Sequence, residues 1–67
     1  MLEEVIGTIA KIAVNYIIVN THEGRKKIPY RNISTSYGGL ALQELLRKRV
    51  KITFWDKVTI EISSPKD

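Results

Sequence analysis

The chain has 67 residues, with 11 Lys and Arg against seven Asp and Glu, so its formal net charge at pH 7 is +4. We expect one small domain over residues 1–67, because so short a chain buries only a small core. The lack of cysteine excludes disulfides and thiolate metal sites, and a single histidine, His22, argues against zinc. No apolar run approaches the roughly 18 residues of a spanning helix, so we expect a soluble, cytoplasmic protein without a membrane partner.

The first part of the chain is rich in β-branched residues. Residues 4–14, "EVIGTIAKIAV", are apolar except for isolated polar residues, which predicts a long strand that is bent or bulged at Gly7. Asn15 ends this run, and residues 16–21, "YIIVNT", predict a second strand.

A turn and a third strand are expected next. Residues 22–24, "HEG", are polar and end in a glycine that can adopt positive φ. Residues 25–33, "RKKIPYRNI", predict the third strand. Pro29 has no N–H to donate to a ladder, so this strand should have a free edge or a bulge there.

The periodicity changes after Ile33. Residues 34–39, "STSYGG", are typical of a loop, with three hydroxyl side chains that could cap a helix. Leu42, Leu45 and Leu46 then recur at helical spacing. We expect one short helix over roughly residues 39–48, with basic residues in its last turn, where they suit the helix dipole.

The last two strands show strict alternation. Their apolar positions are Val50, Ile52, Phe54, Val58, Ile60 and Ile62. A hairpin that places Phe54 opposite Val58 needs residues 55–57 as its connection. A single unbroken strand would preserve the same alternation, and residues 63–67 should form a frayed tail.

The order is therefore strand, strand, strand, helix, strand, strand. This order predicts a mainly β protein, a small five-stranded OB-fold-like barrel with one helix between strands 3 and 4. The isoleucine-rich, cysteine-free composition is also typical of thermophile proteins.

Several motifs resemble the bacterial translation initiation factor one family and its archaeal relative. That family has a G-T-[IV] first strand, a strand–turn–strand ending in an acidic residue or Asn and then Gly, and a closing GDKV-[TV]-[VI]-E hairpin. The matching positions are Gly7, Thr8, Ile9, Glu23, Gly24 and 56–61. This resemblance implies an OB-fold and a nucleic-acid-binding role in translation.

A second resemblance implies a different barrel. "GTIAKI" and "NTHEGRKKIPYRNI" are similar to the Sm-like β-domain of small mechanosensitive channels, and "PYRNIST" is similar to the closing strands of bacterial Sm-type RNA chaperones. This alternative implies an Sm/SH3-like barrel that binds RNA as a ring-shaped homo-oligomer. Sm barrels normally carry a helix before the first strand, whereas only four residues precede Val5, which favours the OB-fold.

Cations and aromatic residues alternate with the buried positions of the predicted strands. Such a face suits single-stranded RNA or DNA, because cations follow the phosphates while bases stack on aromatic rings. The net positive charge favours the same class of partner. The candidate nucleic-acid-binding residues are Tyr16, Arg25, Lys27, Arg31, Arg49, Lys51, Trp55 and Lys57.

Two other interpretations remain open. The cations could simply maintain solubility and protect strand edges, with Trp55 packing over the barrel end. Alternatively, the segment "YGGLALQELL" could dock on a protein partner. No catalytic constellation is evident, since Asp56 and Glu61 are isolated acids and the serines lack a nearby base. We therefore expect a non-enzymatic protein without metal or cofactor.

Overall fold

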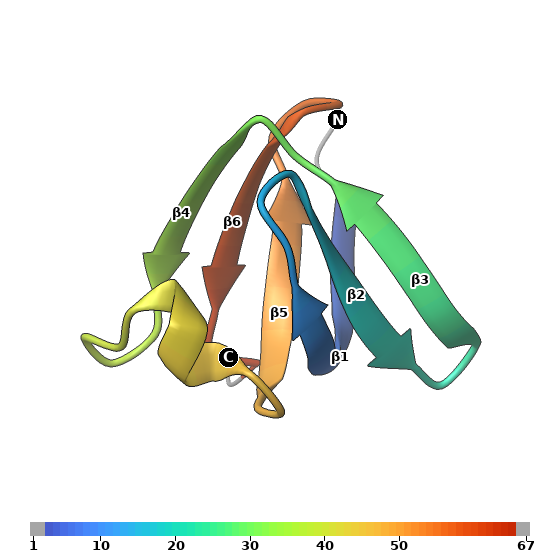
Figure 1. Ribbon diagram of the computed structural model, residues 1–67, viewed down its shortest axis with the longest axis horizontal. Helices are drawn as coiled ribbons and strands as arrows, with labels where there is room; N and C mark the ends of the chain where they lie inside the picture. Colours follow the sequence, from blue (N-terminus) through green and yellow to red (C-terminus); the bar gives the residue numbers. More distant parts are fainter. Residues whose placement is uncertain (1–2, 66–67) are drawn as a thin grey trace.

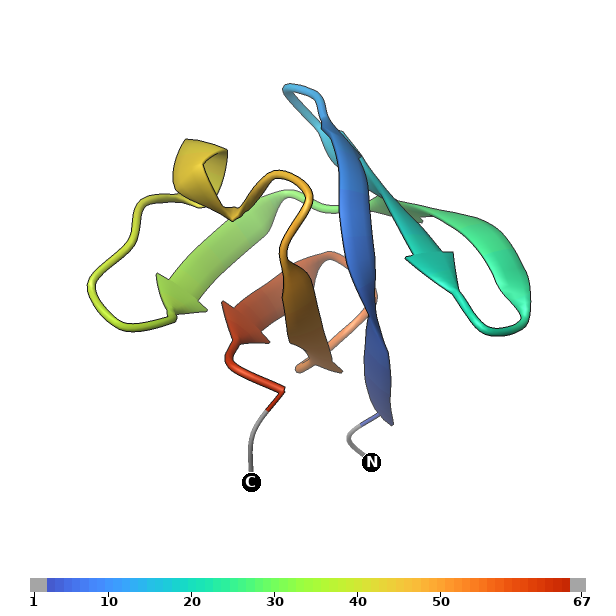
Figure 2. The same cartoon turned by 90° about the horizontal axis from the view of Figure 1, so that it is seen from below.

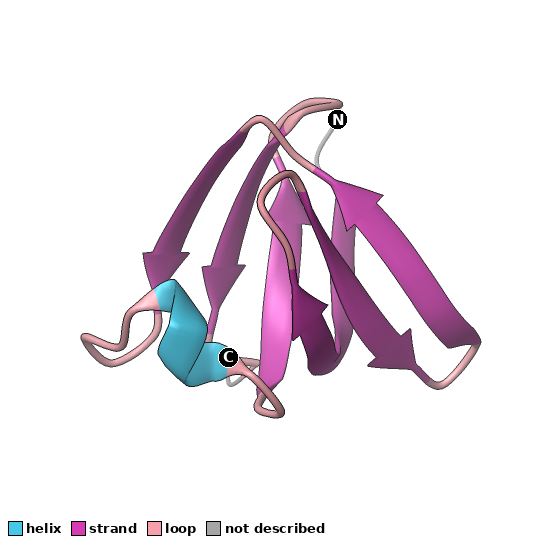
Figure 3. Cartoon of the chain, in the orientation of Figure 1, coloured by secondary structure: helices cyan, strands magenta, loops and turns pink. Residues whose placement is uncertain are grey.

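The computed structural model describes residues 3–65, which form one six-stranded sheet (Figure 1). The hydrogen-bonded order of its strands is β3-β2-β1-β5-β6-β4. The strands are β1 (Glu3–Ile12), β2 (Tyr16–Thr21), β3 (Gly24–Pro29), β4 (Asn32–Ser36), β5 (Arg49–Phe54) and β6 (Thr59–Ser63). The mainly β class predicted from the sequence is confirmed, and strands dominate the chain in Figure 3.

Strand β1 joins the two halves of the sheet, because it pairs antiparallel with β2 on one side and with β5 on the other. Its irregularity was expected at Gly7 but lies between Ile9 and Lys11, where the register with β2 shifts. Gly7 instead allows a close approach, since a Cβ there would lie 2.6 Å from the Asn20 carbonyl oxygen. Gly7 thus lets β2 pass close over β1.

The prediction of one third strand over residues 25–33 is wrong, because the chain forms two strands with different partners. Strand β3 ends at Pro29, which cannot donate to a ladder. The Arg31 and Asn32 amides then donate to the Val58 carbonyl, and β4 continues parallel to β6. Ser34 and Ser36, predicted to be in a loop, belong to β4.

The five-stranded closed barrel is corrected to a six-stranded sheet that is not closed. Its hydrogen-bonded ladder ends at β3 on one side and at β4 on the other. Seen from below, β3 and β4 lie on opposite sides of β1, and the sheet curls between them (Figure 2). The two end strands are nevertheless consecutive in the chain, joined through Tyr30 and Arg31.

The predicted helix over residues 39–48 is also wrong. Only one 3-10 turn, η1 (Leu42–Leu45), forms, and it lies between β4 and β5. The chain before it bends through Gly38 and Gly39, both at positive φ, and the chain after it bends through Arg47 at φ 70°. These bends leave room for a single turn, which places Leu45 in the core.

The closing hairpin has a different register from the one predicted. Phe54 pairs with Ile60, not with Val58, and the connection between the end of β5 and the start of β6 is the four residues 55–58. The Asp56 carboxylate fixes this turn, because its Oδ1 accepts hydrogen bonds from the backbone amides of Val58 at 2.9 Å and Thr59 at 2.8 Å. Val58 is consequently left exposed at the turn.

The core lies inside the curl of the sheet and draws on five of the six strands and on η1. Its buried residues are Ile9, Ile17, Val19, Ile28, Leu45, Val50, Ile52, Ile60 and Ile62. Because successive side chains of a strand point to opposite faces, this set fixes which residues project outward. Within residues 3–65, no helix is long and apolar enough to cross a membrane.

The close approach at Gly7 gives the first prediction. We expect Gly7→Ala to destabilise the fold by roughly 1–3 kcal/mol, because the new methyl group would meet the Asn20 carbonyl, which cannot move without breaking the ladder. Urea unfolding measures the loss. Gly38→Asn is the control, since that position is open and asparagine tolerates its left-handed φ. Equal effects of the two changes would contradict this role for Gly7.

The second prediction concerns the turn at Asp56. Hydrogen bonds from the Val58 amide and the Thr59 side chain hold the pKa of Asp56 below its usual value of 3.8. Because this pKa is lower in the folded than in the unfolded state, the ionised carboxylate stabilises the fold above pH 3.8. This stabilisation is lost as the pH falls through the folded-state pKa. The stability gap between the wild type and Asp56→Ala should therefore narrow in acid, as measured by urea unfolding against pH.

Asp56→Asn separates the charge from the turn geometry, since its amide oxygen can still accept both backbone hydrogen bonds. We expect it to hold the turn without the acid dependence. A gap between wild type and Asp56→Ala that stays constant from neutral pH to well below 3.8 would contradict the account.

Candidate nucleic-acid interface

The outer face of the sheet is assembled in rows that cross several strands. Residues paired directly across two strands project on the same face. Thr8 pairs with Arg49 of β5 and with Asn20 of β2, and Asn20 pairs with Arg25 of β3. One row therefore crosses four strands, with arginines at its ends and a hydroxyl and an amide between them. The Arg25 Nε donates to the Asn20 Oδ1 at 3.4 Å, which orients both side chains.

A second row lies beside the first. Lys11 pairs with Ile18, and Ile18 pairs with Lys27. Both lysines converge on Tyr16, with their Nζ atoms 5.7 Å (Lys11) and 4.5 Å (Lys27) from the centroid of its ring. These are cation–π distances, so the Tyr16 ring interacts with two ammonium groups on the outer face.

Lys11 was not among the residues predicted from the sequence. In an unbroken strand it would share the inward side of Ile9, but the register shift at Ala10 turns Lys11 outward and Ile12 inward. A signal for this shift exists in the sequence. The apolar residues Ile9 and Ile12 are three positions apart, which breaks the period of two that a regular strand requires.

Lys51 completes the outer face. It pairs with Ile6, and its Nζ lies 3.8 Å from the Glu4 carboxylate, so its charge is partly compensated. Glu4 is the one acidic residue that β1, β2, β3 and β5 place on this face within residues 3–65. We call the five cations the basic face: Lys11, Arg25, Lys27, Arg49 and Lys51.

Three predicted residues lie away from the basic face. Arg31 is in the link between β3 and β4, and Trp55 and Lys57 are in the β5–β6 turn. Lys57 still borders a shallow hollow at the edge of β3 that Lys27 also lines. The structure thus brings together five of the eight predicted residues, with Lys57 at the margin.

Trp55 is held on another part of the sheet. Its Nε1 donates to the Glu61 Oε1 at 3.1 Å, and the Ser36 hydroxyl donates to the Glu61 Oε2 at 3.0 Å. The indole is 54% exposed, but it lies toward β6 and is separated from Tyr16 by β1 and β5. Tyr16 and Trp55 therefore do not form one continuous stacking surface.

Protection of strand edges accounts for only part of the basic face. Arg25 and Lys27 lie on β3, which is an end strand of the sheet, and lysine or arginine on such a strand discourages aggregation. Lys51, by contrast, is paired on both sides, with Ile6 of β1 and Ser63 of β6. Lys11 pairs only with β2 and Arg49 only with β1, although both strands have two neighbours in the sheet. Edge protection therefore does not explain Lys51.

Within residues 3–65, no three His, Cys, Asp or Glu side chains gather where they could hold a metal ion. The Asp56 carboxylate is engaged by the hairpin turn, and both Glu61 oxygens accept hydrogen bonds. The arrangement is suited to binding an anion.

Comparison of the chain with protein-family models, with curated proteins and with solved structures found no match.

Proposed function

We propose that this protein is a non-enzymatic module that binds single-stranded RNA or DNA across the basic face. The observation that supports the proposal best is the placement of five cations from β1, β3 and β5 on one outer face, where two of them, Lys11 and Lys27, lie at the Tyr16 ring. Cations around an aromatic ring suit a flexible polyanion whose bases can turn toward the protein.

The two rows suggest a division of roles. Phosphates would contact Arg25 and Arg49 at the two ends of the first row, and Lys11 and Lys27 in the second. When Lys27 turns to a phosphate, the side of the Tyr16 ring that it covers becomes available to a base. The hydroxyl of Thr8 and the amide of Asn20 lie between the arginines, where they could hydrogen-bond a base edge.

The strand pairing supports the finer proposal of an OB-type fold. If β3 and β4 are counted as one strand interrupted at Tyr30 and Arg31, the chain has five strands. The first then pairs with the second and fourth, and the third with the second and fifth, as in a partly open Greek-key barrel. The second and third strands of that fold commonly bind oligonucleotides, and here they carry Tyr16, Arg25 and Lys27. A role in translation stays a prediction that rests on the resemblance alone.

The ionic strength dependence of binding tests this proposal. If Lys11, Arg25, Lys27 and Arg49 each contact a phosphate, four contacts at about 0.7 each give a slope of log K against log salt of about −3. We expect Lys27→Gln to weaken binding to every sequence and to make the slope shallower by about one contact. Fluorescence anisotropy of a labelled single-stranded oligonucleotide measures both effects.

Lys26→Gln is the matched control, because Lys26 lies next to Lys27 in β3 but projects to the other face of the sheet, as does its strand partner Val19. The Lys26 Nζ also lies 3.6 Å from the Glu23 Oε1. It should change the affinity much less. Equal losses for the two variants would mean that net charge alone drives binding. Absence of binding at low salt would refute the proposal and leave solubility as the role of the cations.

A further inference from the structure

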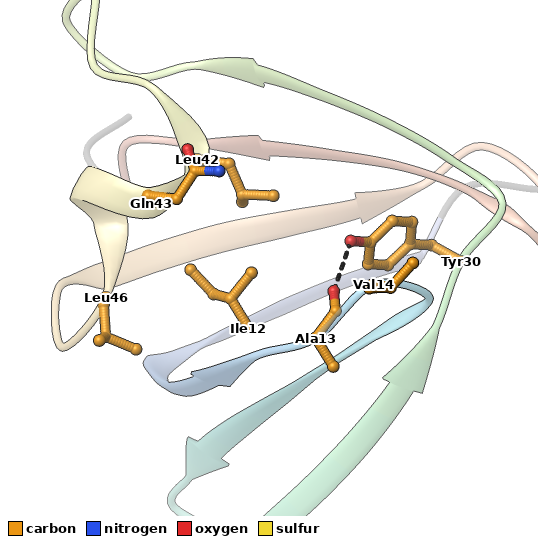
Figure 4. A pocket seen from close by; sticks show the side chains of 7 residues that line it. All are labelled: Ile12, Ala13, Val14, Tyr30, Leu42, Gln43 and Leu46. Atoms are coloured by element: carbon orange, nitrogen blue, oxygen red, sulfur yellow. Dashed lines mark hydrogen bonds between the residues drawn. The ribbon is translucent and has the colours of Figure 1, made fainter.

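A second surface, distinct from the basic face, lies between the β1–β2 turn and η1 (Figure 4). It is a groove whose lining residues carry no charge. They are Ile12, Ala13, Val14, Tyr30, Leu42, Gln43 and Leu46. Ile12 pairs with the buried Ile17 and faces the same, inner side of the sheet. The groove therefore opens on the opposite side of the sheet from Lys11 and Lys27.

Within residues 3–65, the exposed large apolar side chains concentrate along this groove. Val14 is 95% exposed and Leu46 is 43% exposed. A neighbouring hollow shares Val14 and Tyr30 with the groove and extends it to Val58, which is also exposed. Three of the five exposed large hydrophobic residues among residues 3–65 thus border one concave surface, a distribution typical of interaction sites.

The groove is formed before any partner arrives. The Tyr30 hydroxyl donates to the Ala13 carbonyl at 2.9 Å, and the Tyr30 amide donates to the Asn15 carbonyl at 3.0 Å. These two hydrogen bonds fix the β1–β2 turn against the start of the β3–β4 link. Ile12, Tyr30 and Leu42 also pack on the core, so the floor of the groove is continuous with it.

Charge around the groove is positive. Arg31 lines the neighbouring hollow that shares Val14 and Tyr30 with the groove, and Arg47 directly follows Leu46 in the sequence, so these two cations form its cationic rim. Glu44, the acidic residue of η1, accepts a hydrogen bond from the Ala41 amide at 2.8 Å, which engages its carboxylate locally. The groove therefore combines an apolar floor with a cationic rim.

We propose that this groove docks an acidic amphipathic segment of a protein partner. Aliphatic side chains of the segment would fill the space between Val14 and Leu46, and its carboxylates would meet the surrounding cations. The floor offers aliphatic groups and the edge of a tyrosine whose hydroxyl is already engaged, which suits peptide side chains better than stacked bases. This inference does not depend on nucleic-acid binding.

Selection from a displayed library of random peptides tests the docking proposal. The full chain serves as bait, and peptides that bind Val14→Asp are removed. We expect the enriched peptides to combine acidic residues with large apolar residues at helical or alternating spacing. A synthesised peptide from this set should bind the parent and lose about tenfold or more in affinity to Val14→Asp and to Leu46→Asp.

Val14→Lys distinguishes apolar contact from charge, because it removes the apolar side chain but adds to the cationic rim; it should also weaken binding. Ile6→Asp, at an exposed apolar residue of the outer face, is the control and should leave peptide affinity nearly unchanged. Three results would overturn the proposal: no enrichment, full binding to Val14→Lys, or displacement of the peptide by an oligonucleotide that binds in the groove.

Discussion

The close contact at Gly7 is the constraint on which the arrangement of both candidate surfaces depends. Strand β1 must pair with β2 and β5 at once, and β2 passes so near that a Cβ on residue 7 would meet the backbone oxygen of Asn20. The missing side chain lets the sheet curl tightly around a core of isoleucine, valine and leucine. The same curl spreads the outer residues of β3, β2, β1 and β5 into one convex face and leaves Ile12 at the groove on the inner side.

The fold was predictable from the sequence where the evidence was local. The strand over residues 16–21 and the alternation of Val50 and Ile52 were correct, because a period of two and β-branched composition act within one strand. The third-strand error concerns partners far apart in the chain: after Pro29 the chain leaves β2 and pairs with β6, a change that depends on tertiary hydrogen bonds. The hairpin error is local, because the hydrogen bonds of Asp56 set the turn that pairs Phe54 with Ile60. A helix was predicted because the spacing of the leucines was given more weight than Gly38 and Gly39, which bend the chain before this segment.

The candidate site was predictable to a similar extent. The alternation of side chains along each strand correctly predicted that Tyr16, Arg25 and Lys27 project outward. It could not indicate which outward residues of a curled sheet are neighbours. Trp55 consequently lies apart, held by Glu61 toward β6. Lys11 was missed because one extra residue reverses parity along the rest of a strand, and a regular alternation had been assumed there.

The central claim is that the convex outer face, and not the Trp55 turn, contacts nucleic acid. It is tested most directly by a titration of the isotope-labelled protein with a short single-stranded oligonucleotide at low salt, followed by two-dimensional nuclear magnetic resonance. The account predicts that the largest shifts occur at Lys11, Ile18 and Lys27, while the Trp55 indole resonance stays in place. Shifts centred on Trp55, or no shifts at all, would contradict it.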